Sequence, residues 1–397
     1  MVLRRWIIST LMILPLVFAQ SGWTQTPGQG AASPSQMEME EGDAPRLTFS
    51  GYGELHYNIP SSVNGAAKNS KMDFHRLVLG WNYVFSDRIT LYAEAEFEHA
   101  AQEMELEFAF LDFFIDPAFN VRAGALLMPV GPLNEYHEPP LFYSVERPYF
   151  QKFIIPTTWQ EGGIGVFGSP LPGLNYRVYL VSGLNSSGFS GENGLRKGRG
   201  KVAGAEGKPK TGEELAVVGR LEYSPMAGFD LGLSLYQGNS NQDNDPNLGD
   251  DAGVSIVEVD GRARVSGIDF RAVYAQIEID DSAQINSANG LLTPGKATDV
   301  AEEITGWYVE LAYRLGQTKG TDWDLVPFVR LEEINTHDKV AATTTLNPAF
   351  NRNVTTYGVA YFPHPQVAFK ADYEDWENDD PNDPDWEQFN LGLAFMF

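Results

Sequence analysis

The sequence has no cysteine among its 397 residues, which excludes disulfides and thiolate metal sites. After the first twenty residues it also has no apolar run approaching the ~20 residues that a membrane-spanning helix needs. Basic residues are scarce, since 28 Lys and Arg stand against 53 Asp and Glu, for a formal net charge of −25. A chain this acidic offers no basic face to nucleic acid.

The first twenty residues are typical of a secretory signal peptide. Arg4 and Arg5 give the positive start, an apolar stretch runs to Phe18, and Ala19 stands at a cleavage point. The alternative, a membrane anchor, would need a longer and less interrupted apolar stretch. Residues 21–45 are rich in Gln, Gly, Ser, Pro and Glu and predict a flexible periplasmic lead-in.

From residue 46 to residue 397 apolar and polar side chains alternate with period two, which predicts strands with two unlike faces. Ile89, Leu91 and Ala93, for example, alternate with Thr90 and Tyr92. In a soluble sandwich the apolar face would pack on a second sheet. In a membrane barrel it faces lipid, while the polar face lines the lumen.

About sixteen such segments follow one another, and their connections alternate between short and long. The predicted strands are 46–57, 71–85, 88–99, 103–115, 120–127, 162–168, 173–184, 214–224, 229–239, 252–259, 262–280, 303–316, 321–336, 351–362, 366–377 and 386–397. A single outer connection, between the third and fourth strands, is short. The pattern predicts an all-β fold, a transmembrane antiparallel β-barrel of about 16 strands with short periplasmic turns and long extracellular loops.

Aromatic residues support this interpretation at the short turns and at the C-terminus. Trp81, Tyr83 and Phe85 precede one short turn, as expected for rings at the headgroup level. Ordinary strand composition is the alternative for any one such cluster. The last segment alternates strictly and ends on Phe397, which we interpret as the assembly signal that outer-membrane barrels present to the barrel-assembly machinery.

Four stretches resemble the phosphate-selective porin (O and P) family of Gram-negative outer membranes. They are FHRLVLG at 74–80, VRAGALLMPVG at 121–131, VPFVRLE at 326–332, and 357–374 with its YFPHP turn and Lys370. The resemblance covers residues 49–397 and implies a sixteen-stranded, trimeric, passive channel. Members often carry Gln and Lys where Ala125 and Leu127 stand, so this acidic chain represents a divergent subgroup.

Period two also assigns charged side chains to the lumen-facing sides of the strands. The predicted pore-lining residues are Arg76, Arg88, Arg122, Arg177, Arg220, Arg314, Arg330, Glu332 and Lys370, and the other acids on these faces are Glu94, Glu96, Glu222, Glu310 and Asp372. The basic members would form a stripe along a water-filled lumen. Alternatively, pairs such as Arg220 with Glu222 simply stabilise the wall. Arg264, Asp269 and Arg271 of the segment 262–280 have conflicting phase, which leaves them unassigned and predicts a bulge.

The longest insertion, near 128–161, is predicted to fold inward and constrict the channel. It is too apolar for an exposed loop, because it carries residues such as Phe142, Phe150 and Trp159. Its polar members would frame the eyelet, the narrowest part of the channel. They are Glu135, His137, Glu138, Glu146, Arg147 and Lys152. The alternative is an outer loop that packs on a neighbouring subunit.

These features predict a porin of the Gram-negative outer membrane through which small hydrophilic solutes or ions diffuse. The expected partners are outer-membrane lipid and lipopolysaccharide, the barrel-assembly machinery and two further copies in a homotrimer, but no nucleic acid. No cofactor and no metal site is expected, because neither His137 nor His99 has acids at a recurring ligand spacing.

Two other functions remain open. A plugged structural or adhesion barrel would show no conductance, and an outer-membrane enzyme would need a nucleophile beside a base, which the sequence does not indicate. The outer connections near 240–251 and 378–385 carry only acids, whereas 185–213 is basic. We therefore expect weak ion selectivity and no tight phosphate binding.

Overall fold

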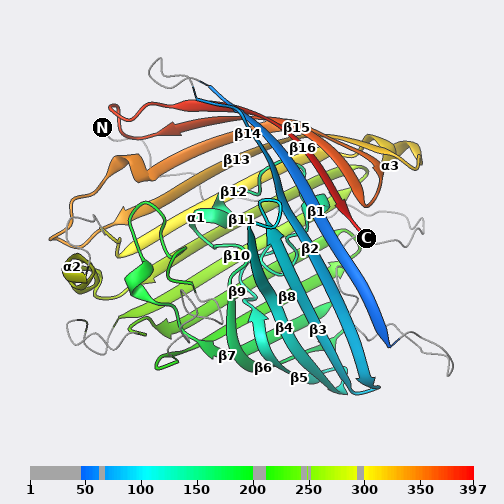
Figure 1. The fold of residues 1–397 in the computed structure, drawn as a ribbon, viewed down its shortest axis with the longest axis horizontal. Helices are drawn as coiled ribbons and strands as arrows, with labels where there is room; N and C mark the ends of the chain where they lie inside the picture. Colours follow the sequence, from blue (N-terminus) through cyan, green and yellow to red (C-terminus); the bar gives the residue numbers. More distant parts are fainter. Residues whose placement is uncertain (1–45, 62–67, 200–211, 243–247, 249–251, 293–298) are drawn as a thin grey trace. The chain divides into compact units, whose positions relative to one another are not determined.

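The computed structural model describes residues 46–61, 68–199, 212–242, 248, 252–292 and 299–397. Within them, sixteen strands form one closed antiparallel sheet in which each strand pairs with its neighbours in sequence and β16 pairs with β1 (Figure 1). The predicted barrel is confirmed. In this part of the chain no helix is long and apolar enough to cross a membrane. The predicted signal peptide and lead-in lie outside the described residues.

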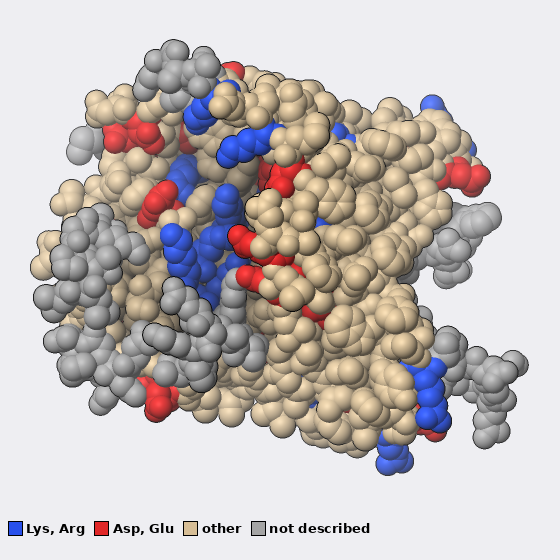
Figure 2. All heavy atoms as spheres, in the orientation of Figure 1, with Lys and Arg blue, Asp and Glu red and all other residues tan. Residues whose placement is uncertain are grey.

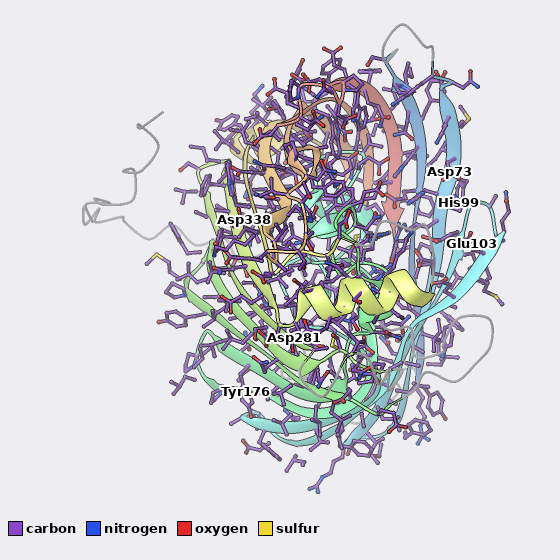
Figure 3. The ribbon with its side chains drawn as sticks, turned by 90° about the vertical axis from the view of Figure 1, so that its left-hand side faces the viewer. Asp73, His99, Glu103, Tyr176, Asp281 and Asp338 are labelled. Atoms are coloured by element: carbon purple, nitrogen blue, oxygen red, sulfur yellow. The ribbon has the colours of Figure 1, made fainter. Side chains whose placement is uncertain are left out.

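The strands are connected alternately by short turns and longer segments, except that the outer connection between β3 and β4 is short, as predicted. Their bounds are β1 Leu47–Pro60, β2 Lys71–Ser86, β3 Ile89–Glu98, β4 Glu103–Asp116, β5 Phe119–Leu127, β6 Gln160–Leu171, β7 Leu174–Ser182, β8 Leu215–Met226, β9 Phe229–Asn239, β10 Gly253–Val265, β11 Ile268–Ile279, β12 Glu303–Tyr313, β13 Asp324–Lys339, β14 Asn351–His364, β15 Val367–Asn378 and β16 Trp386–Met396. The helical pieces are η2 Pro139–Leu141, α1 Phe150–Phe153, η3 Ser186–Gly188, α2 Ser282–Leu292, α3 Leu315–Lys319 and η5 Pro348–Phe350. Figure 3 looks onto the end of the barrel that carries α2 and the longer connections.

The outer face of the sheet is apolar. On β8 and β9, for example, Val217, Leu221, Leu231 and Leu235 are each about half exposed, and such residues recur around the barrel. Water would oppose so large an apolar surface, whereas the hydrocarbon core of a bilayer solvates it. Because the sheet is closed, the backbone N–H and C=O groups of its strands form hydrogen bonds with each other, and lipid could not supply such partners. The fold and its lipid-facing surface place the barrel in a Gram-negative outer membrane.

One predicted turn is in the wrong place. Asp260 and Gly261 read as a hairpin turn, but β10 continues through them and turns at Ser266 and Gly267, whose φ angles are 52° and 87°. Asp260 instead forms an ion pair of 2.8 Å with Arg220 inside the barrel. With the turn at 266–267 the ladder between β10 and β11 is regular, so the predicted bulge is also wrong.

The inner face is less polar than the alternation predicts. Near their outer ends β10 and β11 turn Val254, Ile256, Val273 and Ile277 inward, and all four are buried. They belong to one hydrophobic cluster with residues of the segment between β5 and β6. Because protein rather than water covers this part of the inner wall, apolar side chains are stable there.

Candidate functional site

The segment between β5 and β6, residues 128–159, crosses the interior of the barrel. Its contacts with the wall include Gly131 N–H to Ser234 Oγ (3.2 Å), Tyr143 OH to Asp269 (2.6 Å), Val145 N–H to Asp372 (2.5 Å), Tyr149 OH to Glu374 (2.8 Å) and Phe150 N–H to Glu332 (2.9 Å). His137 contacts Tyr52 of β1 at 2.8 Å, and β1 lies opposite β9, the strand of Ser234, in the closed sheet. A segment that reaches strands so far apart in the sheet has to lie across the lumen (Figure 1). We call it the inner loop.

Aromatic packing explains why the inner loop takes this path. Phe150 of α1 packs edge-on against Tyr308 with ring centroids 5.7 Å apart. Tyr149 packs against Trp376 at 4.2 Å in the same manner. Both arrangements are favourable for aromatic quadrupoles, and burial of each ring adds ~1.5–3 kcal/mol. The apolar content of the segment therefore stabilises it against the inner wall.

Two predicted pore-lining cations anchor the inner loop. Arg330 is fully buried and donates to Ser144 Oγ at 2.6 Å and to Glu332 at 2.7 Å. Lys370 donates to the carbonyl oxygens of Pro139 and Ser144 at 2.7 and 2.8 Å. These cations bind the loop backbone and its hydroxyl groups, and this contact excludes them from the solvent of the lumen.

The other predicted cations of the strands form ion pairs. Arg76 binds Glu54 and Glu96 (2.8 and 2.9 Å), Arg122 binds Asp112 (2.7 Å), Arg177 binds Glu222 and Glu135 (2.8 and 3.2 Å), and Arg220 binds Glu222, Glu258 and Asp260 (2.9, 3.2 and 2.8 Å). They act as ion pairs rather than as free charges. The remaining two lie at the short-turn end, where Arg88 follows β2 in an exposed turn and Arg314 caps α3 and binds Asp324 at 2.6 Å.

The six polar residues predicted for the eyelet occupy unlike environments. Glu135 pairs with Arg177, and His137 is buried against Glu107 at 2.5 Å. Glu146 Oε1 lies 3.2 Å from His56 Nδ1. Burial raises the pKa of Glu146, but the charge and hydrogen bond of His56 outweigh burial and lower this pKa to about 2. These three residues therefore fasten the inner loop to the wall.

The other three eyelet residues belong to a set of charges that keep contact with solvent. The partly or fully exposed cations are Arg147, Lys152, Arg196 and Arg199, and the partly exposed acids are Glu94, Glu98, Glu105 and Glu138. The acids Glu94, Glu98 and Glu105 lie on β3 and β4, where the connecting segment is short. Arg196 and Arg199 come from the segment after η3, and Arg199 donates to Thr158 Oγ1 at 2.9 Å. Figure 2 shows a cluster of basic side chains beside acidic side chains in a recess near the centre of the view.

Burial shifts the pKa values of the members of this set that lie in connecting segments. It lowers the pKa of Arg199 to about 10, so that the guanidinium stays charged at neutral pH. It raises the pKa of Glu138 above its usual value of 4.5. The arrangement creates a transverse field between the basic segments and the acidic β3–β4 wall.

Several interior charges were not predicted from the alternation. Glu107 shares a face with Glu105 and alternates with Met104 and Leu106, so the period-two pattern could have found it; it stands at a bulge between the pairs Glu94–Phe108 and Ala95–Leu106. Glu258 and Glu374 continue the polar faces of their strands, so the period-two pattern could have found them. Arg196 and Arg199 lie in a long connection, where the pattern has no predictive value.

No family model matches this chain. A protein of Aquifex aeolicus (strain VF5), described as uncharacterized, is 32% identical over 388 residues, which cover 93% of this chain and 83% of that protein. The chain belongs to the family of this Aquifex aeolicus protein.

Two solved structures illustrate the fold. OmpF of Salmonella typhi, in complex with daunomycin, superposes with a TM-score of 0.56 at 15% identity and covers 88% of this chain and 97% of its own. The outer membrane channel DcaP of Acinetobacter baumannii gives a TM-score of 0.56 at 12% identity, with the same coverages of 88% and 97%. At these identities the likeness concerns the fold, which is the outer-membrane porin-like β-barrel.

Proposed function

We propose that the protein is a porin through which small hydrophilic solutes or ions diffuse passively, and that it works as a homotrimer without catalysis. The observation that carries this proposal is the opposition of partly exposed bases and acids beside the inner loop. A transverse field of this kind orients dipolar solutes in a narrow aqueous passage. The four sequence stretches support a further proposal, that the family is a divergent branch of the phosphate-selective porins.

Partly exposed side chains also lie on the inner face of β3, β4, β5 and β8, nearer the short turns than the opposed charges beside the inner loop. Tyr92 stacks on Phe110 with ring centroids 5.4 Å apart, and the Arg122 guanidinium lies 4.0 Å from the Phe110 ring. Glu222 remains partly exposed on β8. In contrast, the inner charges of β13 and β15 are buried under the inner loop. We infer that solutes pass on the β3–β8 side of the loop.

A plugged structural or adhesion barrel is the second candidate, because so many inner side chains are buried. Recording from the refolded protein in a planar bilayer separates the two functions. We expect discrete channel steps, weak ion selectivity and no block of chloride current by micromolar phosphate. A correctly folded barrel without any steps would support the plug, and block by micromolar phosphate would contradict the expected selectivity.

The raised pKa of Glu138 predicts a pH-dependent selectivity. As pH falls through this pKa, Glu138 takes up a proton and the mouth loses one negative charge. The preference for cations over anions should then fall by about two- to fivefold, since a unit charge within 4 Å is worth roughly 1 kcal/mol or less in water. Reversal potentials measured between pH 7.5 and pH 4 test this.

Glu138→Gln should reduce this pH-dependent change, because the residue is then neutral throughout. Asp383→Asn removes an acid from an exposed outer connection and serves as the matched control, which should retain the profile of the unmodified protein. Identical profiles for the Glu138→Gln variant and the unmodified protein would contradict the assignment of Glu138 to the passage.

A further inference from the structure

Two histidines and an aspartate meet at the outer end of the barrel, beside the short β3–β4 connection. Asp73 and His75 lie at the start of β2, and His99 follows the last residue of β3. Asp73 Oδ2 lies 3.1 Å from His75 Nδ1 and 2.8 Å from His99 Nδ1. Figure 3 shows Asp73 and His99 side by side at the rim of the barrel.

Local backbone geometry brings the three side chains together. His75 is the extra residue of a bulge in β2, since Glu54 pairs with Arg76 and Leu55 pairs with Phe74. The bulge changes the direction of the His75 side chain relative to a regular strand. Asp73 and His75 are two residues apart, so the period-two pattern already places them on the same face of β2; the pattern could not predict their contact with His99.

The β3–β4 connection completes the group. His99 adopts a left-handed conformation with φ of 50°, and Ala100 and Ala101 do the same. His99 N–H donates to the His75 carbonyl oxygen at 3.0 Å. The backbone thus holds His99 against β2, in a conformation that non-glycine residues rarely adopt.

A further histidine holds the ring of His75. His56 stacks on it with ring centroids 4.8 Å apart and an interplanar angle of 15°. His56 itself contacts Glu54 at 3.0 Å and Glu146 of the inner loop at 3.2 Å. Such outer contacts orient the imidazoles of metal sites.

We propose that Asp73, His75 and His99 bind one divalent transition-metal ion of the Zn²⁺ class. One ligand atom from each residue can be chosen so that all lie within 4.8 Å of one another. Tetrahedral bonds of 2.0–2.1 Å separate ligands by about 3.3 Å, so the two Asp73 contacts need to open by only a few tenths of an ångström. Two imidazoles suit Zn²⁺, Ni²⁺ and Cu²⁺ better than they suit Mg²⁺, and Zn²⁺ also accepts a carboxylate oxygen.

The surroundings leave the site open to an ion. The side chains of His75, Asp73 and His99 are 27%, 30% and 42% exposed, so an ion can enter and keep a water ligand. Arg76 lies close to His75, but Glu54 and Glu96 neutralise it at 2.8 and 2.9 Å. The sequence alone predicts no metal site here, because the acids that it places near His99 are only Glu96 and Glu98.

Titration of the tag-free, refolded full chain in detergent with Zn²⁺ tests the proposal, with Co²⁺ absorption as a second readout. We expect one saturable Zn²⁺ per chain. Asp73→Asn and His99→Asn should each weaken binding at least tenfold. Asn suits both variants because it retains the size of Asp and tolerates the left-handed backbone at position 99. With Co²⁺ the visible spectrum should indicate imidazole ligands.

His364→Asn is the matched control, because His364 is the exposed last residue of β14, at the short-turn end of the barrel. It should bind Zn²⁺ as the unmodified protein does. Heat-modifiable migration on gels identifies folded protein, and His75→Gln replaces any variant that does not fold. Absence of saturable Zn²⁺ uptake, or equal affinity in the unmodified protein and in the folded ligand variants, would overturn the proposal. Channel recordings do not enter this test, so it stands apart from the porin proposal.

Discussion

Replacement of residues 134–152 of the inner loop by a short Gly/Ser linker should raise the single-channel conductance severalfold and admit larger sugars. The exchange removes Phe142, Tyr143 and Phe150, which are buried between the strands. It also removes Arg147 and Lys152 from the charged mouth. A wider and less charged passage conducts ions faster and excludes large solutes less strictly.

The barrel should survive this change. The pairing of β5 with β6 from Asn120–Phe167 to Leu127–Gln160 lies outside the exchanged residues, and the cost of closing a loop depends only weakly on its length. Charges that the loop now buries, such as Arg330 and Glu332, would become hydrated in the wider lumen instead of remaining unpaired in protein. The loss of buried aromatic residues should still lower the melting temperature.

Exchange of 379–385 for a linker of equal length is the control, because this outer connection is largely exposed and should leave the conductance unchanged. Planar-bilayer recording and liposome swelling with sugars of increasing size provide the measurements. If the inner-loop variant assembles correctly and conducts as the unmodified protein does, solutes pass elsewhere, and the roles of Glu138, Arg147 and Lys152 at the eyelet are wrong.

The wall of the barrel was predictable from the sequence because its two environments differ so strongly. Lipid requires apolar side chains at every second position, as at Leu231, Leu233 and Leu235, and the short turns interrupt the pattern at regular intervals. The misplaced turn shows the limit of this reasoning. Asp260 and Gly261 have turn chemistry, yet the ion pair of Asp260 with Arg220 stabilises them within a strand.

The candidate site was less predictable, because it depends on departures from regular strands. Bulges at Glu107 of β4 and at His75 of β2 shift the phase of the alternation within each strand, and the left-handed residues 99–101 bring His99 to Asp73. Neither bulge has a local sequence signal as strong as a glycine at a turn. The burial of Arg330 is also a tertiary effect, since it follows from the path of a loop almost two hundred residues earlier in the chain.

Deletion of Phe397 should reduce the amount of assembled barrel severalfold. Phe397 N–H donates to the Gly51 carbonyl oxygen at 2.8 Å, and Gly51 N–H donates to the Phe397 carbonyl oxygen at 3.0 Å. These bonds continue the pairing of β16 with β1 by which the sheet closes. Each is worth about 1 kcal/mol in water and more in lipid, where unpaired groups find no solvent.

The ring of Phe397 also stabilises the pairing of β16 with β1. A Cβ atom on Gly51 would lie 2.7 Å from the Phe397 ring, and one on Gly53 would lie 2.6 Å from the Phe395 ring. The two glycines therefore make room for rings that cover β1 on its lipid side, an arrangement that pins the register of strands. Gly51→Val should disturb the same contact from the other strand and also reduce assembly.

Phe369→Ala is the matched control, because Phe369 is a similarly exposed ring, at 52% against 57% for Phe397. It lies on β15, which is not one of the two strands that close the sheet. Outer-membrane abundance and heat-modifiable migration measure assembly in each variant. We expect Phe369→Ala to assemble nearly as well as the unmodified protein, because the strand pairing of β15 does not depend on that ring. Equal abundance of the Phe397 deletion and the unmodified protein would show that neither closure of the sheet nor recognition by the assembly machinery depends on the last residue.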